Sequence, residues 1–174
     1  SPIKAAELLA ERLWGQTYGL VLTSATLRSL GNFDSLRRDT GMPDEASCIA
    51  VDGAFDYARA ALLKVPSDAV EGNQVVAHSR YLIDNLPAMF ANHEGTLVLF
   101  SSRRQMQEVQ GELPVKLRGE ILMQGQFSNR EMLRLHRERI DSGDRSVLFG
   151  LASFAEGVDL PGNYCRHVVI VKLP

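Results

Sequence analysis

The stretch from Phe149 to Gly162 (FGLASFAEGVDLPG) combines residue types that ligand-binding loops use. Two carboxylates, Glu156 and Asp159, lie among three glycines and a proline. Glycine lets the backbone turn sharply and approach a ligand closely. Open α/β folds bind ligands in the loops that follow buried parallel strands. The alternative is a connecting turn that carries two acidic residues by chance. The other polar segments of the sequence are needed to distinguish a ligand-binding loop from such a turn.

Two further segments, Thr23–Thr26 (TSAT) and Ser101–Arg104 (SSRR), carry groups suited to phosphate. They offer hydroxyls, arginines and the backbone N–H groups of a helix start. Arg103 and Arg104 are expected in the first turn of a helix, which is the unfavourable end for a cation. A bound anion would offset that conflict. Solvated surface arginines are the alternative.

A basic helix face is predicted further along the chain. Arg130, Arg134 and Arg137 stand at i, i+4 and i+7 and therefore share one face of a helix. Glu131 and Glu138 are expected elsewhere on that helix, which would leave the arginines partly uncompensated. The face could contact a nucleic-acid backbone, or it could be an ordinary solvated surface.

Composition places the chain among soluble globular proteins, with 174 residues, 45% of them hydrophobic and 23% charged. The formal net charge of −2 gives no general reason to expect nucleic acid. Of the 19 basic residues, however, 4 are lysine and the other 15 are arginine. Arginine binds phosphate through a planar fork of donors that lysine lacks. A compositional bias would explain the same excess.

Several kinds of site are not expected. The sequence contains no G-x-x-x-x-G-K-[ST] loop for phosphates, no G-x-G-x-x-G, no G-x-S-x-G and no H-x-x-x-H or C-x-x-C pair. Two cysteines make neither a disulfide framework nor a metal site. Apolar runs are too short to span a membrane, and no signal peptide is expected. The residues alone therefore predict no metal site and no complete active site.

Short apolar runs alternate with amphipathic segments, which predicts βαβ units and a mainly parallel sheet covered on both faces. Strands are expected at Tyr18–Thr23, Ser47–Val51, Ala60–Val65, Thr96–Phe100, Glu120–Met123, Ser146–Phe149 and His167–Leu173. Helices are expected before Gly15, at Asn32–Thr40, at Val75–Phe90 with Pro87 kinking or ending it early, from Ser102 to about Leu113, and from Ser128 to Ser142. In that arrangement the three polar segments would gather at one edge of the sheet. His136 is expected in the core.

Four ordered strings then carry a resemblance to a known family. LTSATL (22–27), LVLFSSRRQM (97–106), the stretch from Met132 to Gly162, and HVVIVKLP (167–174) resemble the second motor domain of DinG/YoaA-type helicases, bacterial relatives of the XPD helicases in superfamily 2. The resemblance implies a RecA-like, three-layer α/β/α domain with a mainly parallel sheet. The stretch SFAEGVDLPG is its most specific part.

The resemblance also implies roles for the polar segments. Ser24, Ala25 and Thr26 would form helicase motif III, which couples nucleotide state to DNA handling. Motif IV would place Ser101, Ser102, Arg103 and Arg104 beside the DNA backbone, and motif V would run from Ser153 to Asp159. In motif V, Ser153 would meet DNA, Gly157 would allow close approach to the nucleotide, Asp159 would face it and Glu156 would orient the loop. The basic face of Arg130, Arg134 and Arg137 would add DNA contacts.

A longer parent protein follows from the same resemblance. ATP and Mg²⁺ would be bound mainly by a first motor domain, which would also carry the phosphate-binding loop and a 4Fe–4S cluster held by four cysteines. Motif VI would follow Pro174. Residues 1–174 are thus expected to be a fragment, inactive alone, with residues 1–28 at the junction with the first motor domain.

The parent is expected to be a bacterial cytoplasmic helicase moving 5′ to 3′ in DNA repair or replication. Its expected partners are single-stranded DNA, the first motor domain, and replication or repair proteins, with no membrane. The alternative is a non-catalytic α/β module that binds nucleic acid or protein.

Overall fold

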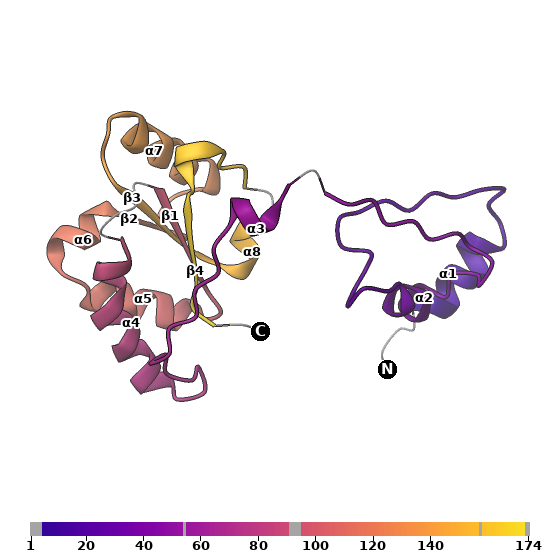
Figure 1. Ribbon diagram of the computed structural model, residues 1–174, viewed down its shortest axis with the longest axis horizontal. Coiled ribbons are helices and arrows are strands. Elements are labelled where there is room, and N and C mark those ends of the chain that lie inside the picture. Colours follow the sequence, from indigo (N-terminus) through magenta and orange to yellow (C-terminus); the bar gives the residue numbers. More distant parts are fainter. Residues whose placement is uncertain (1–4, 54, 91–94, 157, 173–174) are drawn as a thin grey trace. The chain divides into compact units, whose positions relative to one another are not determined.

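The computed structural model describes residues 5–53, 55–90, 95–156 and 158–172 (Figure 1). The chain divides into two compact units, Ser1–Leu63 and Lys64–Pro174. We call them the N-terminal unit and the C-terminal unit.

A four-stranded sheet forms the centre of the C-terminal unit. Its strands are β1 (Gly95–Phe100), β2 (Ile121–Met123), β3 (Ser146–Leu151) and β4 (His167–Ile170). They lie in the order β2-β3-β1-β4, and each neighbouring pair is parallel. All four strands coincide with predicted strands. The last was expected to continue to Leu173, but β4 ends at Ile170, and Val171 and Lys172 are not in a strand; Leu173 lies outside the described residues.

Helices cover both faces of this sheet (Figure 1). They are α4 (Val75–Phe90), α5 (Arg103–Glu112), α6 (Val115–Glu120), α7 (Asn129–Asp141) and α8 (Ala152–Ala155). On one face Val98 and Phe100 of β1 pack in a core with residues of α4 and α5. On the other face Leu97 and Leu148 pack with residues of α7 and α8. Because alternate strand residues point to opposite faces, the result is the three-layer α/β/α fold that was predicted.

The helix signals in this unit match the structure in most respects. Ser102 and Ser128 accept hydrogen bonds from the backbone N–H groups of Gln105 and Glu131, at 3.4 and 3.2 Å, and so cap α5 and α7. Gly143 follows α7 with φ of 81°, a left-handed conformation that glycine tolerates. Pro87 does not end α4, which continues to Phe90. Of the two effects expected of Pro87, a kink or an early end, the early end is therefore excluded.

The N-terminal unit has no sheet among its described residues. It contains α1 (Ala5–Leu9), the π-helical turn η1 (Ala10–Trp14), α2 (Asp34–Thr40) and the short α3 (Tyr57–Ala60). The helices before Gly15 and Gly41 were predicted. The strands predicted at Tyr18–Thr23, Ser47–Val51 and Ala60–Val65 are absent, because the extended segments pair with no neighbouring strand. Val21 and Val51 are 89% and 88% exposed.

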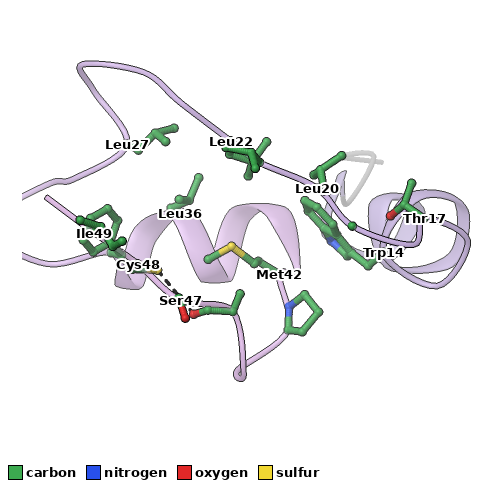
Figure 2. A pocket seen from close by; sticks show the side chains of 15 residues that line it. Trp14, Thr17, Leu20, Leu22, Leu27, Leu36, Met42, Ser47, Cys48 and Ile49 are labelled. Atoms are coloured by element: carbon green, nitrogen blue, oxygen red, sulfur yellow. Dashed lines mark hydrogen bonds between the residues drawn. The ribbon is translucent and has the colours of Figure 1, made fainter.

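An open apolar cavity of about 550 Å³ lies within the N-terminal unit. Leu20 and Leu22 of the extended segment face Leu36 and Met42 across it, beside Trp14 (Figure 2). The Trp14 indole N–H donates to the carbonyl of Thr40 at 2.8 Å and ties η1 to α2.

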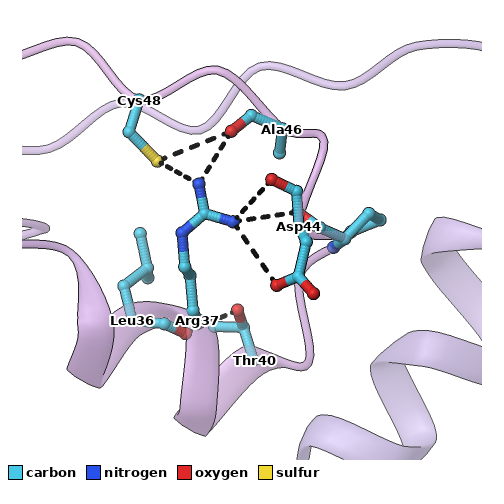
Figure 3. Close-up of polar contacts among 7 residues, drawn as sticks. Leu36, Arg37, Thr40, Asp44, Ala46 and Cys48 are labelled. Carbon is cyan, nitrogen blue, oxygen red and sulfur yellow. Dashed lines mark hydrogen bonds and ion pairs between the residues drawn. The ribbon is translucent and has the colours of Figure 1, made fainter.

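The loop after α2 is held by the Arg37 side chain (Figure 3). Its guanidinium donates to the carbonyls of Pro43, Asp44 and Ala46 at 2.9 to 3.2 Å. It also lies 3.4 Å from the Cys48 sulfur. This arginine therefore serves the structure of its own loop.

Candidate nucleotide and DNA interface

The carboxyl ends of β2, β3 and β1 lie side by side, because these strands are adjacent and parallel. Three loops leave from this edge: Ser101–Arg104 after β1, residues 124–128 after β2, and the crossover of residues 152–166 after β3. Parallel sheets bind ligands at this edge. The structure therefore brings together the polar segment at residues 101–104 and the start of the Phe149–Gly162 stretch, as predicted.

Arg103 and Arg104 occupy the first two positions of α5, and both are exposed. The Arg103 side chain extends from the end of β1 to the loop after β2. There a Cβ added to Gly125 would lie 2.9 Å from the arginine Nη1, and the φ of that glycine is +99°. Gly125 therefore leaves room for the Arg103 guanidinium at the sheet edge.

Gln124 is a site residue that sequence reasoning missed. Its side-chain oxygen accepts a hydrogen bond from the backbone N–H of Leu151 at 2.9 Å. The backbone N–H of Gln124 donates to the Phe149 carbonyl at 2.8 Å. These two bonds fix the point at which the crossover leaves β3. Its position directly after the strand Glu120–Met123 and before a glycine was the available signal.

The crossover begins with α8, whose Phe154 is buried at 1% exposure. Ser153 and Glu156 are exposed at this end of the crossover. Gly157, which was expected to allow close approach to a nucleotide, lies outside the described residues. Gly150 has a packing role: an added Cβ would lie 2.7 to 2.9 Å from atoms of Phe154.

Farther along the crossover, Asp159 lies beside α7. Its backbone carbonyl accepts a hydrogen bond from Arg137 at 2.7 Å, whereas the residue itself is exposed. The Arg137 guanidinium also lies 5.8 Å from the centre of the Tyr164 ring. One arginine thus contacts both ends of the segment from Asp159 to Tyr164.

His136 is buried, as predicted, and hydrogen-bonds on both sides of its ring. Its Nε2 lies 2.6 Å from the Tyr164 carbonyl and its Nδ1 lies 2.8 Å from the Ser146 hydroxyl. A carbonyl can only accept, so Nε2 carries the proton and Nδ1 accepts from the hydroxyl. Burial lowers the pKa of His136, and the positive charges of Arg139 and Arg137 lower it further.

Arg130, Arg134 and Arg137, which were predicted to form a basic face of α7, are not equivalent. Arg134 is paired with both Glu131, at 2.6 Å, and Glu138, and these pairs raise the pKa of the guanidinium. The expectation that both glutamates would lie elsewhere was wrong, because i, i+3 and i, i+4 neighbours share a helix surface. Arg137 contacts the crossover. Arg130 is exposed and has no ion pair or hydrogen bond within the described residues.

Ser24, Ala25 and Thr26 lie in the N-terminal unit and do not follow a strand. The Ser24 hydroxyl lies 3.1 Å from that of Thr26 and accepts from the Thr26 N–H at 3.2 Å, in an exposed turn. The prediction that three loops would gather at one edge therefore holds for the two loops of the C-terminal unit. The third has no strand to place it there.

The described residues contain no group of three or more His, Cys, Asp or Glu side chains that could hold a metal ion. Cys48 and Cys165 are free thiols. Among the described helices, none combines the length and the apolar character that crossing a membrane requires.

The parallel sheet, its two helical layers and the polar loops at its carboxyl edge define a RecA-like α/β domain. Residues 86–174 match the family described as the helicase C-terminal domain. The chain belongs to this family.

Known relatives extend the match to the whole chain. The chain is 37% identical over 179 aligned positions to the ATP-dependent DNA helicase DinG of Photobacterium profundum, covering 100% of this chain and 26% of that protein. The proteins of the same name from Salmonella paratyphi A and Escherichia coli K12 are 36% and 35% identical, with 98% of this chain and 25% of each relative covered. The predicted resemblance to DinG-type helicases is confirmed, and the chain spans about a quarter of the length of these curated relatives.

Proposed function

We propose that this chain is the second RecA-like motor domain of a longer ATP-dependent DNA helicase of the DinG type. The observation that carries the proposal is the sheet edge at which Arg103, Arg104 and the crossover after β3 meet. A cationic helix start and an acidic loop at one edge suit a cleft shared by DNA phosphates and a nucleotide. The similarity to helicases named DinG supports the same function.

Within this proposal, Ser101, Ser102, Arg103, Arg104 and Ser153 face the DNA backbone, and Glu156, Gly157 and Asp159 face the nucleotide. Of the α7 arginines, Arg130 is the best placed to add a DNA contact, because Arg134 is neutralised by two glutamates. ATP and Mg²⁺ are bound mainly by the first motor domain, which also holds the 4Fe–4S cluster. ATP hydrolysis there changes the closure of the two domains and moves the protein along one strand.

The N-terminal unit supplies motif III through Ser24, Ala25 and Thr26, and its first 28 residues belong at the junction with the first motor domain. Its structure fits such a junction. Leu20 and Leu22 remain 44% and 41% exposed beside an open apolar cavity. Exposed apolar surface of this kind is normally covered by a partner. In the parent, the first motor domain would cover it.

The parent would belong to superfamily 2 and work from 5′ to 3′ in DNA repair or replication, in the bacterial cytoplasm. Single-stranded DNA is its substrate, and replication or repair proteins are its expected partners.

The deciding experiment measures ATP hydrolysis by the full-length protein with and without single-stranded DNA. We expect DNA-stimulated turnover, and none from residues 1–174 alone. Asp159→Ala should reduce turnover about a hundredfold, as the loss of an interaction made with the reacting nucleotide does. Asp144→Ala, which removes an exposed carboxylate after α7, is the matched control and should leave turnover unchanged. Turnover that is unaltered in Asp159→Ala would contradict the role of the crossover.

DNA binding by the chain itself gives a second test. A few arginine–phosphate contacts should give weak binding that falls between low and moderate salt and shows little sequence preference. Equal retention on single-stranded DNA at both salt concentrations would exclude the backbone contacts. The alternative, a non-catalytic module that binds nucleic acid or protein, would give no DNA-stimulated turnover in the full-length protein, and a module that binds only protein would also show no retention on DNA.

A further inference from the structure

The crossover segment from Asp159 to Tyr164 is held against α7 at both of its ends. At the Tyr164 end, His136 donates to the backbone carbonyl at 2.6 Å and the tyrosine hydroxyl donates to Asp141 at 2.9 Å. The start of β1 lies on the other side of this end. A Cβ added to Gly95 would come within 2.4 Å of the Tyr164 carbonyl oxygen. The Tyr164 end is therefore fixed by several independent contacts.

The Asp159 end depends on Arg137. Among the described residues 158–160, the bond from Arg137 to the Asp159 carbonyl is the one hydrogen bond to another element. Val158 and Leu160 add apolar contacts with the core on this face of the sheet. Apolar contacts are not directional, so they leave the orientation of the Asp159 peptide to the hydrogen bond.

The bond from Arg137 is made to the backbone and not to the carboxylate. The exposed Asp159 side chain is therefore left available for a ligand while the peptide that carries it is fixed. The Arg137 Nε is buried and has no hydrogen-bond partner within the described residues. A guanidinium that is partly buried, bonded to a carbonyl and placed over the Tyr164 ring is not free to bind a phosphate through its planar fork.

We propose that Arg137 is a positioning residue for the proposed ATPase reaction, and not a DNA contact. It orients the Asp159 peptide so that the carboxylate meets the bound nucleotide. The proposal rests on the proposed function, and it separates Arg137 from Arg130, which lies two turns away on the same helix with its side chain exposed.

Steady-state ATPase kinetics of the full-length protein test this separation. Arg137→Gln should lower kcat at saturating single-stranded DNA about tenfold, the effect of losing one charge-assisted hydrogen bond. The DNA concentration for half-maximal stimulation should stay unchanged. Arg80→Gln is the matched control, since it removes an exposed helical arginine that forms an ion pair with Asp84 on the same helix, and it should change neither quantity. A raised half-maximal DNA concentration with kcat retained would overturn the proposal and make Arg137 a DNA contact.

Backbone NMR relaxation on the 174-residue chain gives a readout that needs no ATPase activity. Arg137→Gln should lower the order parameters of the amides of residues 158–160, while those of β3 keep the values of a rigid backbone and report that the domain is folded. Equal order parameters at residues 158–160 in the variant and the wild type would refute the positioning role. If the wild-type full-length protein showed no ATPase, the proposed function would fail, yet the relaxation result would still decide whether Arg137 fixes the loop.

Discussion

At the scale of single residues, arginines in this chain serve the fold more often than the sequence suggests. Arg37, Arg137 and Arg139 each donate to a backbone carbonyl. Arg145 pairs with Glu120 at 2.6 Å and donates to the Phe90 carbonyl at 3.2 Å. The planar fork that suits phosphate also suits carbonyls at the ends of helices and in loops. The excess of arginine is therefore partly structural.

Gly150 provides the first residue-scale prediction. Its Cα leaves no room for a side chain beside Phe154, so Gly150→Ala must displace a buried ring. We expect Gly150→Ala to destabilise the domain by about 1–3 kcal/mol, the usual cost of overpacking a core. Gly111→Ala in α5 is the control, because nothing lies within 4 Å of the added Cβ. The control should gain up to about 1 kcal/mol through higher helix propensity.

Urea denaturation measures the stability of both variants, and a shift of the midpoint at an unchanged m-value reports a change of stability. A Gly150→Ala midpoint equal to that of the wild type would show that the glycine is not needed for packing. Its role would then return to the close approach of a ligand.

His136 gives the second residue-scale prediction. Burial lowers its pKa, so the folded state holds the ring neutral. The unfolded state binds a proton below about pH 6.5, the ordinary pKa of histidine, and the folded state resists it. The stability contributed by neutral His136 is therefore present above that pH and is lost as the pH falls through the folded pKa.

We expect the free energy of unfolding to fall between pH 7.5 and 5.5, and His136→Gln to reduce that fall by up to about 1.4 kcal/mol for each unit by which the pKa is lowered. The measurement is denaturant unfolding at both pH values. His78→Gln is a control for the loss of another buried histidine. Identical pH dependence of the unfolding free energy in His136→Gln and the wild type would show that the titration of His136 does not contribute to it.

At the scale of elements, the predicted strands that form and the predicted strands that are absent have similar sequences. Thr96–Phe100 and Tyr18–Thr23 are both short apolar runs, yet only the first pairs with neighbours on both sides. A strand needs partner strands and a covering helix, and these come from elsewhere in the chain. The local pattern of apolar residues could therefore predict the sheet of the C-terminal unit, because the sequence also predicted the helices α4 and α7 that cover it. It could not reveal that residues 18–23 lack partners within the described residues.

The residues of the candidate site likewise divide into those that the sequence could place and those that it could not. Arg103, Arg104 and the crossover after β3 could be placed at one edge because parallel strands end together. The position of Gln124 at the end of a predicted strand could mark it as a site residue, but the contacts that define the roles of Gln124 and Arg137 could not be predicted, since they are made with residues 22 or more positions away. The pairing of Arg134 with Glu131 and Glu138 was readable from the i, i+3 and i, i+4 spacing.

The start of α5 yields an element-scale prediction. The Gln105 backbone N–H donates to the capping residue Ser102, but the Gln105 side chain does not bond back to Ser102. Its amide donates instead to His78 at 3.0 Å and Ser79 at 3.2 Å, while His78 also bonds to the Val171 carbonyl at 3.1 Å. This buried network joins α4, α5 and Val171, the residue that follows β4. Gln105→Ala should cost about 1–3 kcal/mol, since it leaves a buried ring nitrogen without a donor.

Gln107→Ala is the matched control, because Gln107 lies on the exposed face of the same helix and should change stability by less than about 0.5 kcal/mol. Thermal or urea unfolding measures the stability change of both variants. Equal effects of the two substitutions would show that the network contributes nothing beyond helix propensity.

At the scale of the whole molecule, the two units differ in what holds them together. The C-terminal unit buries two clusters of apolar side chains, one on each face of its sheet. In the N-terminal unit, not one described residue is buried, and Ile49, Val51 and Phe55 are 70% or more exposed. Its stability must therefore come from local hydrogen bonds such as those of Arg37 and Trp14, which are individually small.

The last prediction concerns this difference in stability. In hydrogen exchange of the intact chain, the amides of β1 and β3 should exchange only through global unfolding, whereas those of α1 and α2 should exchange faster by several orders of magnitude. Helices of seven residues or fewer are marginal without a packed face. In the proposed full-length helicase, the proposed first motor domain should raise the protection of α1 and α2 and leave that of β1 unchanged. Equal protection of both units in the isolated chain would mean that the N-terminal unit has a core of its own, and its assignment to the junction would lose its physical basis.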